Sequence, residues 1–244
     1  MRGKAFPSAN MAPPPPHGYN PAMTTAAADT ADWAAQTEAR LLDAALPLVG
    51  RFGWTSRLVA AAALAAGLAL ADAELLLPRG ARDLAALLSA RHDQAALAAL
   101  ASVDVSTLKI RERIARAVQA RTEAAMADEP AVRRLAGFFA LPPNAALGAR
   151  LSWTSADLLW RWAGDVSTDE NHYSKRAILA GLLTSTLLMR LSGGPGPAEA
   201  HLNTGIEAVM AYETFKRRFS GRDLAGQAAA LLGRLRYGAA PPAG

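Results

Sequence analysis

The chain has 244 residues, of which 51% are hydrophobic, enough for one large domain or two small ones with a substantial core. It contains no cysteine, which excludes disulfides, thiolate metal sites and cysteine nucleophiles. The formal net charge is +5, and the segment from Thr214 to Gly244, with six basic residues and one acidic residue, accounts for all of it. This local basic character indicates a binding partner with an acidic surface, either anionic lipid or nucleic acid.

The first 31 residues hold six of the fifteen prolines and few charges, a composition typical of disorder. Acidic residues are absent before Asp29, as in a transit peptide, although arginine is scarce. The N-terminus lacks the apolar region of a secretory signal. The longest early uncharged run, 58–71, is shorter than the roughly 20 apolar residues that a bilayer crossing needs. We therefore expect a disordered leader and no transmembrane span.

The rest of the chain is predicted to be helical, because Ala and Leu dominate, β-branched residues are sparse and no run alternates with a period of two. Proline and glycine mark the breaks between segments. The predicted helices span residues 32–51, 56–66, 70–77, 81–101, 105–127, 130–140, 144–163, 168–191, 198–219 and 222–236. The expected fold class is all-α, a bundle of about ten helices.

The first three predicted helices are short, and together with Gly53-Trp54 they resemble the start of a TetR-type regulator, in which a three-helix DNA-binding unit precedes a helical ligand-binding body. The helix that would enter the major groove, 70–77, has two acidic residues and no Arg, Lys, Asn or Gln. Base readout and phosphate contact both need such donors. We therefore predict that residues 32–80 form a vestigial helix-turn-helix unit that binds no nucleic acid.

Three tryptophans lie in the predicted helix at 144–163. Trp153 and Trp160 are seven residues apart and share a helical face, whereas Trp162 lies nearly opposite Trp160. Core packing is the ordinary interpretation of any one of them. The alternative is an apolar ligand chamber between facing helices. The residues alone leave both interpretations open.

Residues 164–189 join a polar, aromatic-bearing helix start to the uncharged run 177–189. Ser167 and Glu170 have the spacing of a capping box, which places the helix start near Thr168. Hydrogen-bonding and stacking groups crowd the first two turns: Asn171, His172, Tyr173, Lys175 and Arg176. The remainder is apolar on nearly every side, as in a helix that is buried or faces lipid. We interpret the segment as a docking element rather than a catalytic one.

This region resembles the signature of the coenzyme Q biosynthesis protein nine family, a group of accessory lipid-binding proteins of ubiquinone biosynthesis. The matching motifs are Trp160-Arg161-Trp162-Ala163-Gly164-Asp165, then Thr168-Asp169-Glu170-Asn171-His172-Tyr173-Ser174-Lys175-Arg176, and then Ser185-Thr186. The similarity extends over about residues 36–237 and is strongest at 153–190. Two departures bear on ligand size and partner affinity: His172 stands where some members have Trp, and Gly205 weakens a helix where a bulky stretch is expected.

The resemblance implies a TetR-like helical fold whose cavity holds an isoprenoid or quinone-like lipid. The lining residues that it suggests are Leu151, Trp153, Leu158, Trp160, Leu182 and Met189. It also implies that a patch formed by Asn171, His172, Tyr173 and Arg176 docks a partner, the di-iron demethoxyubiquinone hydroxylase. It implies no cofactor, a homodimer, and a peripheral place on the inner membrane, bacterial or, in a eukaryote, on the mitochondrial matrix side.

The last predicted helix carries one apolar stripe flanked by arginine. The ordinary interpretation is a final helix packed on its own domain, and the alternative is a helix lying in an anionic membrane surface. The resemblance supports the second. The predicted membrane-binding residues are Leu224, Leu231, Leu232, Leu235, Arg222 and Arg234.

No motif in the chain supports catalysis. His17 lies in the leader, His92 is expected to be a solvated surface residue between two charged neighbours, and His172 and His201 fall on separate helices. There is no Glu-x-x-His pair for a di-iron site, no Gly-rich phosphate loop and no Gly-x-Ser-x-Gly elbow. The glycines at 193–196 follow a helix and are interpreted as a flexible linker. We therefore predict neither enzymatic activity nor a metal site.

The favoured interpretation is a non-enzymatic protein that binds a quinone-pathway lipid and presents it to a hydroxylase at the membrane. The predicted divisions are the leader (1–31), the vestigial helix-turn-helix unit (32–80), the lipid-binding body (81–219), the amphipathic membrane helix (220–237) and a disordered tail (238–244). Two alternatives remain: a TetR-type transcriptional regulator with an apolar effector, and a helical scaffold without a ligand.

Overall fold

The computed structural model describes residues 21–164 and 170–218, and these residues form helices and turns with no strand. The helices are α1 (Pro21–Ala45), α2 (Val49–Phe52), α3 (Ser56–Ala65), α4 (Leu70–Leu76), α5 (Ala81–Leu100), α6 (Ile110–Met126), α7 (Glu129–Ala140), α8 (Pro142–Trp162), α9 (Glu170–Gly193) and α10 (Pro195–Arg218). Short 3₁₀ helices occur at Leu46–Leu48 and Val105–Thr107. The all-α class is confirmed, whereas the TetR-like arrangement stays a prediction.

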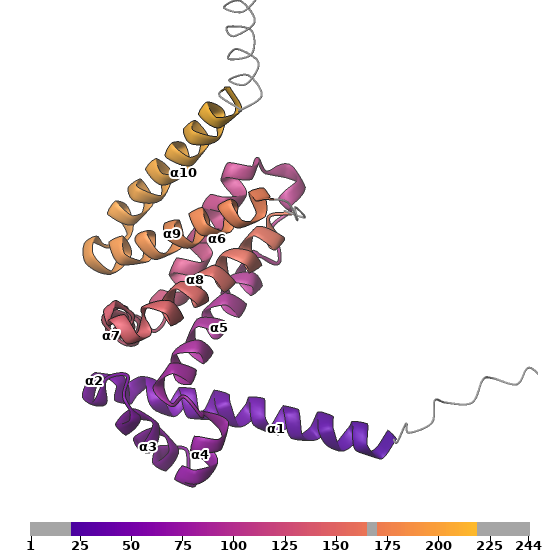
Figure 1. Ribbon diagram of the computed structural model, residues 1–244, viewed down its shortest axis with the longest axis vertical. Helices are drawn as coiled ribbons and strands as arrows, with labels where there is room; N and C mark the ends of the chain where they lie inside the picture. Colours follow the sequence, from indigo (N-terminus) through magenta and orange to yellow (C-terminus); the bar gives the residue numbers. More distant parts are fainter. Residues whose placement is uncertain (1–20, 165–169, 219–244) are drawn as a thin grey trace, which may run out of the picture.

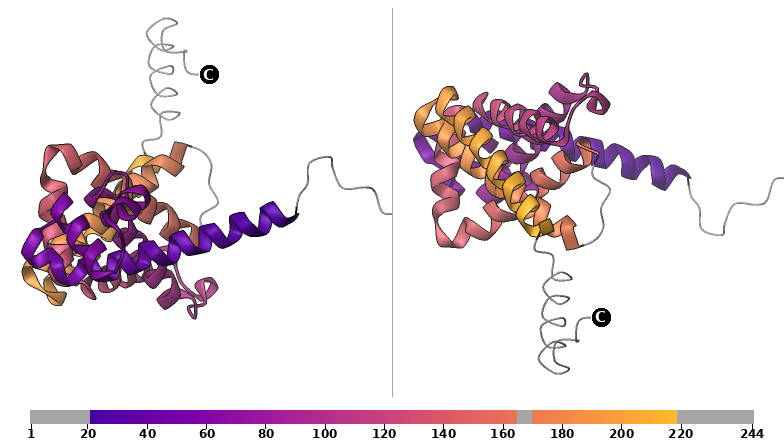
Figure 2. Two further views of the ribbon diagram at one scale, coloured as in Figure 1. Left: turned by 90° about the horizontal axis from the view of Figure 1, so that it is seen from below. Right: turned by 90° about the horizontal axis from the view of Figure 1, so that it is seen from above.

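Helices α1 to α4 gather at one end of the molecule, and α5 leads from them into a body formed by α5 to α10 (Figure 1). Within the body, α5 packs against α6 and α8, while α9 packs against α8, α6 and α10. In both views of Figure 2 the N-terminal part of α1 extends beyond the rest of the helices. The helix predicted at 222–236 lies outside the described residues.

Helix α1 begins at Pro21, well before the expected start at residue 32. Proline suits the first position of a helix, where an N–H would have no intrahelical partner. The residues that follow are rich in alanine, which has the highest helix propensity. The structure thus differs from the predicted leader over residues 21–31.

Buried apolar side chains form two clusters. The first joins α1 to α5 with α7 and includes Leu58 and Leu84. The second joins α6, α8, α9 and α10 and includes Leu159 and Leu202. Three helices tie the two clusters together. Helix α5 supplies Leu100 to the second cluster, while α6 and α9, which belong to the second, supply Ala125 and Leu191 to the first. Each fully buried leucine contributes about 1.5–3 kcal/mol, so both clusters stabilise their part of the fold substantially.

Two glycines with positive φ shape the ends of the body helices. Gly164 (φ 90°) ends α8, where Arg113 Nη1 donates a hydrogen bond to the carbonyl of Ala163 at 2.8 Å. Gly194 (φ 82°) is the single residue between α9 and α10, and Pro195 then begins α10. The predicted flexible linker at 193–196 is therefore a tight turn that folds α10 back along α9.

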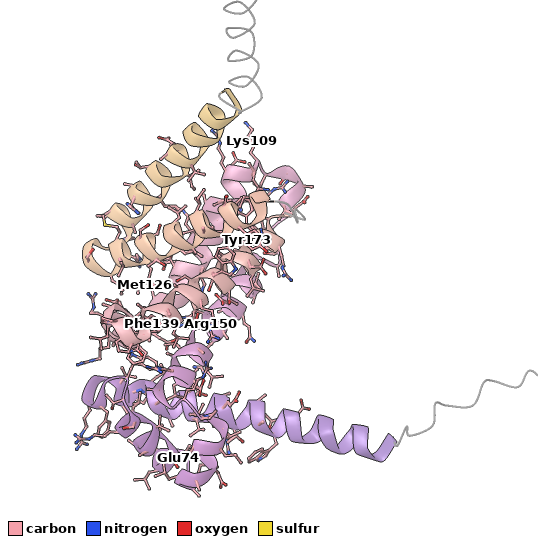
Figure 3. All side chains as sticks on the ribbon, in the orientation of Figure 1. Glu74, Lys109, Met126, Phe139, Arg150 and Tyr173 are labelled. Carbon is pink, nitrogen blue, oxygen red and sulfur yellow. The ribbon has the colours of Figure 1, made fainter. Side chains whose placement is uncertain are left out.

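The α3–α4 pair is bent by 120°, an angle found in helix-turn-helix units. Helix α4 carries Asp72 and Glu74, and Glu74 lies at the far end of the molecule from Tyr173 of α9 in Figure 3. Within the described residues no single helix is long and apolar enough to span a bilayer, although α3 and α4 meet the length and composition criteria jointly as a bent pair.

Candidate functional site

A cavity of about 760 Å³ lies between the two apolar clusters. Helices α5, α6, α7, α8 and α9 all contribute to its wall. The volume falls within the roughly 300–1,000 Å³ that is typical of small-molecule sites, and such sites are mostly apolar with a few placed polar groups. This combination makes the cavity the candidate binding site of the chain.

The apolar part of the wall comes mainly from α7 and α9. Val132, Leu135 and Phe139 follow one another on a single face of α7, at the spacing of an amphipathic helix. Leu183 and Leu187 supply the facing surface from α9. Figure 3 shows Phe139 in the middle of the molecule, between the α1–α4 end and the tip of the body. These side chains provide an apolar surface suited to a hydrocarbon chain.

The cavity is open on the side of α8 and α9 and closed on the side of α5 and α6. Ala149 of α8 and Gly181 and Leu188 of α9 line it and are exposed, so they form its mouth. By contrast, the lining residues Ser89 of α5 and Thr122 of α6 are buried. A molecule that enters at this mouth would therefore reach the α5–α6 wall last.

The buried α5–α6 wall holds an ion pair. Arg121 Nε donates to Asp93 Oδ1 at 2.5 Å, and Arg121 Nη2 donates to Ser89 Oγ at 3.3 Å. The Asp93 side chain is 6% exposed and that of Arg121 is 12% exposed. Breaking a buried pair of this kind leaves an uncompensated charge, which costs more than the pair itself contributes. The pair therefore fixes the position of the guanidinium in the cavity wall.

His92 is buried, with 3% of its surface exposed, and lines the cavity. The expectation that it lies solvated on the surface is wrong. Its Nε2 lies 2.9 Å from Asp128 Oδ2. Burial lowers the pKa of His92 below its ordinary value. The hydrogen bond that the ring donates to Asp128 opposes this shift, whereas the nearby Arg121 charge adds to it. The neutral ring therefore carries its proton on Nε2, facing the carboxylate, and leaves Nδ1 as an acceptor.

Sequence periodicity could have located His92. Leu88 and Ala96, four residues before and after it, are buried, so His92 lies on the inward stripe of α5. The charged neighbours in the sequence were misleading because one of them, Asp93, is itself turned inward to Arg121. The helical position decides burial here, and the adjacent residue types do not.

The structure divides the predicted lipid-binding residues into two groups. Leu151 and Trp153 line the cavity, whereas Leu158, Trp160, Leu182 and Met189 are not among its lining residues. Trp160 and Leu182 border a second space of only about 60 Å³ beside α6 and α10. Although Trp153 and Trp160 share a helical face, they meet different partners because α8 runs from the cavity wall into the second apolar cluster.

The predicted partner-binding residues are also divided. The side chains of Asn171 and His172 lie outside the described residues. Tyr173 is 67% exposed, and its ring centroid lies 6.2 Å from that of Trp153, so it connects the surface to the cavity wall. Arg176 is only 2% exposed, so its side chain does not belong to an exposed patch as expected.

Arg176 is buried because α8 supplies a partner for it. Its Nε donates to Asp157 Oδ1 at 2.6 Å, across the packing contact of α8 and α9. Burial alone would raise the pKa of Asp157, but the hydrogen bond from Arg176 and the charge of Arg161 outweigh it and hold that pKa below its ordinary value. The pair therefore ties the two helices that flank the mouth of the cavity.

The predicted membrane-binding residues, Leu224, Leu231, Leu232, Leu235, Arg222 and Arg234, lie outside the described residues. Among the residues that are described, no three His, Asp or Glu side chains come close enough together to hold a metal ion.

Comparison with known proteins identifies relatives of the chain. A family model, COQ9, matches residues 145–212. The protein named ubiquinone biosynthesis protein COQ9, mitochondrial, is 30% identical over 164 residues in Bos taurus and in Rattus norvegicus, and 29% identical over 164 residues in Homo sapiens. Each alignment covers 64% of this chain and 51–52% of the relative. The chain thus spans about half the length of these curated relatives.

The family match coincides with the part of the fold that surrounds the cavity mouth. Residues 145–212 include most of α8, the whole of α9 and most of α10. The cavity residues Leu151 and Trp153 and the exposed Tyr173 all lie within this range. The resemblance inferred from the motifs at 160–176 is confirmed, because residues 145–212 match the COQ9 family model and the curated relatives carry the same family name.

Proposed function

We propose that this chain is a non-enzymatic accessory protein of ubiquinone biosynthesis and binds an isoprenoid lipid of the quinone pathway in its cavity. One observation carries the proposal: an apolar cavity of about 760 Å³ whose mouth is built by the helices of the COQ9 domain. The relatives are named ubiquinone biosynthesis proteins. Removal of an apolar chain from water contributes about 25 cal/mol per Å², which supplies the driving force for its entry.

Tyr173 supports a role in presenting the lipid to a partner enzyme. Its exposed ring packs on Trp153, which lines the cavity, so a protein that contacts Tyr173 lies next to the bound molecule. Exposed aromatic residues are among those that dominate binding energy in protein interfaces. The proposed partner is a di-iron hydroxylase of the pathway, docked on the surface around Tyr173, Asn171 and His172. Arg176 acts indirectly in this proposal, by holding α9 against α8.

The proposal includes reversible attachment to a membrane, because a quinone with an isoprenoid tail is confined to the bilayer. Residues 220–237 are proposed as the attachment segment on the basis of their apolar stripe and flanking arginines. The relatives are named mitochondrial, and for this chain we propose a peripheral position on the inner membrane. Pairing of two copies is proposed as the working form of the carrier.

The decisive experiment is mass spectrometry of lipids extracted from the purified chain and from a Gly181→Phe variant. Gly181 lines the cavity, and a Cβ atom built on it meets no other atom within 4 Å, so a side chain can begin at the mouth without a clash. Gly137→Phe is the matched control, because Gly137 has the same open surroundings on α7 but does not line the cavity.

Isoprenoid quinones or their precursors are expected in the wild-type and Gly137→Phe extracts and depleted from the Gly181→Phe extract. Empty extracts from a folded wild-type protein would overturn the proposal and favour a scaffold. Salt-dependent DNA binding by the wild-type chain would instead favour a transcriptional regulator, against the acidic character of α4.

A further inference from the structure

The α5–α6 side of the cavity is more polar than a hydrocarbon tail requires. His92 of α5, Thr122 of α6 and Ser155 of the adjoining helix α8 line the cavity, and each is at least nine-tenths buried. Burial of a polar group without a hydrogen bond costs about 1–3 kcal/mol, so a purely apolar occupant would leave these groups unsatisfied. The wall therefore favours a ligand with one polar end.

Four polar atoms in this wall have no hydrogen-bond partner in the described part of the chain: His92 Nδ1, Arg121 Nη1, Thr122 Oγ1 and Ser155 Oγ. None of them is completely enclosed by protein atoms, whereas Thr186 Oγ1, which does not line the cavity, is enclosed and also unpartnered. The four residues that carry these atoms all line the cavity. Together they offer one acceptor, one donor and two hydroxyls that can do either.

The local charge argues against an anionic ligand. Arg121 is neutralised by Asp93, at 2.5 Å, and the neutral His92 faces the carboxylate of Asp128. The group therefore carries one excess negative charge, which would repel a phosphate or carboxylate in a poorly solvated site. An uncharged polar group meets no such repulsion.

We propose that His92, Arg121, Thr122 and Ser155 form a headgroup subsite for an uncharged oxygenated ring, such as the hydroquinone or quinone end of the lipid. A ring hydroxyl donates to His92 Nδ1, and neighbouring ring oxygens accept from Arg121, Thr122 and Ser155. The tail then extends along the α7 and α9 surfaces toward the mouth, and the ring must move out to the mouth before a partner enzyme can act on it. This inference rests on the proposed function, since it specifies the end of the lipid that the cavity recognises.

Calorimetric titration of the full chain with four probes tests the subsite: a hydroquinone with a three-isoprene tail, its dimethyl ether, the same tail without a ring, and the same tail with a diphosphate. The test variant is Thr122→Val with Ser155→Ala, which removes two hydroxyls that have no protein partner and so leaves no group orphaned. Thr186→Val is the matched control, because it removes a buried unpartnered hydroxyl outside the cavity.

The hydroquinone is expected to bind the wild-type chain about tenfold more tightly than the dimethyl ether or the ring-free tail, the effect of one or two net hydrogen bonds. The double variant should lose most of this preference while keeping its affinity for the ring-free tail, and Thr186→Val should change neither. Equal affinity for hydroquinone and ring-free tail, with Gly181→Phe blocking both, would overturn the subsite and leave the proposed function standing.

Two other results are equally informative. Tighter binding of the diphosphate than of the hydroquinone would overturn the uncharged-ring chemistry. Absence of binding by every probe, or binding that Gly181→Phe does not reduce, would overturn the proposed function and with it the subsite.

Discussion

Arg176 is the largest fully buried side chain of the described residues, and its pairing with Asp157 holds α8 and α9 together. Asp157 serves a second arginine, because Arg161 Nη2 lies 2.8 Å from its other oxygen. The two pairs differ in surroundings: the Arg176 side chain is 2% exposed and that of Arg161 is 69% exposed. Burial therefore predicts very different contributions to stability from two ion pairs that share one carboxylate.

Replacement of Asp157 by Ala should lower the free energy of unfolding by about 3 kcal/mol, because it removes the carboxylate from a buried guanidinium. Arg161→Ala, which removes only the exposed partner, should cost less than about 1 kcal/mol. Urea unfolding of both variants measures the difference. Similar losses of unfolding free energy in the two variants would show that the buried Arg176 pair stabilises the fold no more than the exposed Arg161 pair does.

The same carboxylate predicts a dependence of stability on pH. Because the pKa of Asp157 in the folded chain lies below its ordinary value of 3.8, the unfolded chain binds the proton more readily. The stabilisation is complete above that value and is lost as the pH falls through the lower folded pKa. Asp157→Ala should therefore show a weaker decline in stability in this acidic range than the wild-type chain.

Single residues show what helical spacing predicts and what it leaves open. Trp153 lines the cavity, and its contact with a ligand stays a prediction. Trp160, on the same predicted face, borders a different space, because tertiary packing along α8 changes over one heptad. Arg176 shares a face with His172 by spacing, but a carboxylate on another helix draws it inward. Helical periodicity identifies the side of the helix on which a residue lies. The contacts that the residue makes depend on which helix packs against that side.

At the scale of elements, α9 and α10 pack closely at Gly205. A Cβ atom added there would lie 2.6 Å from the Leu182 Cδ1 atom, so the absence of a side chain at Gly205 allows the contact. Gly205 appeared in the sequence as a weak point of the helix, since glycine lowers helix propensity by about 1 kcal/mol. The structure gives the compensating reason, which is the approach of Leu182 from α9.

The substitution Gly205→Leu should lower the free energy of unfolding by about 1–3 kcal/mol, the usual cost of overpacking. Gly137→Leu provides the opposite case, because nothing lies within 4 Å of a Cβ atom added at this exposed position of α7. Improved helix propensity should raise stability there by about 0.5–1 kcal/mol. Thermal unfolding of both variants checks the pair. A stabilised Gly205→Leu protein would contradict the close approach.

Most helix boundaries were predictable from proline and glycine. The segments 56–66, 70–77 and 81–101 differ from α3, α4 and α5 by one residue at their ends. The early start of α1 was missed because prolines before it suggested disorder, although the alanines after Pro21 favour a helix. A cavity was expected, but most of its lining residues could not be predicted, because they depend on how five helices leave space among them.

At the scale of the whole molecule, the cavity has three parts: a closed polar wall at α5 and α6, an apolar surface from α7 and α9, and a mouth at α8 and α9. The ion pair of Arg121 with Asp93 lies on the closed side, and Tyr173 lies near the mouth beside Trp153. A lipid bound with its ring inward would place its tail toward α8 and α9. Exchange with a membrane would then require the chain to approach the bilayer, which the basic segment at its C-terminal end would favour.

Removal of residues 220–244 should abolish binding to vesicles that contain anionic lipid, because this step deletes both the apolar stripe and the arginines beside it. The double substitution of Arg222 and Arg234 by Ala keeps the stripe and should weaken binding about 30-fold, at about 1 kcal/mol for each cation. Co-sedimentation at two salt concentrations measures both, and circular dichroism verifies that the variants stay helical. Unchanged sedimentation of the shortened chain would assign membrane contact to another surface. If the shortened chain loses binding but the double alanine variant keeps it, apolar insertion dominates the attachment.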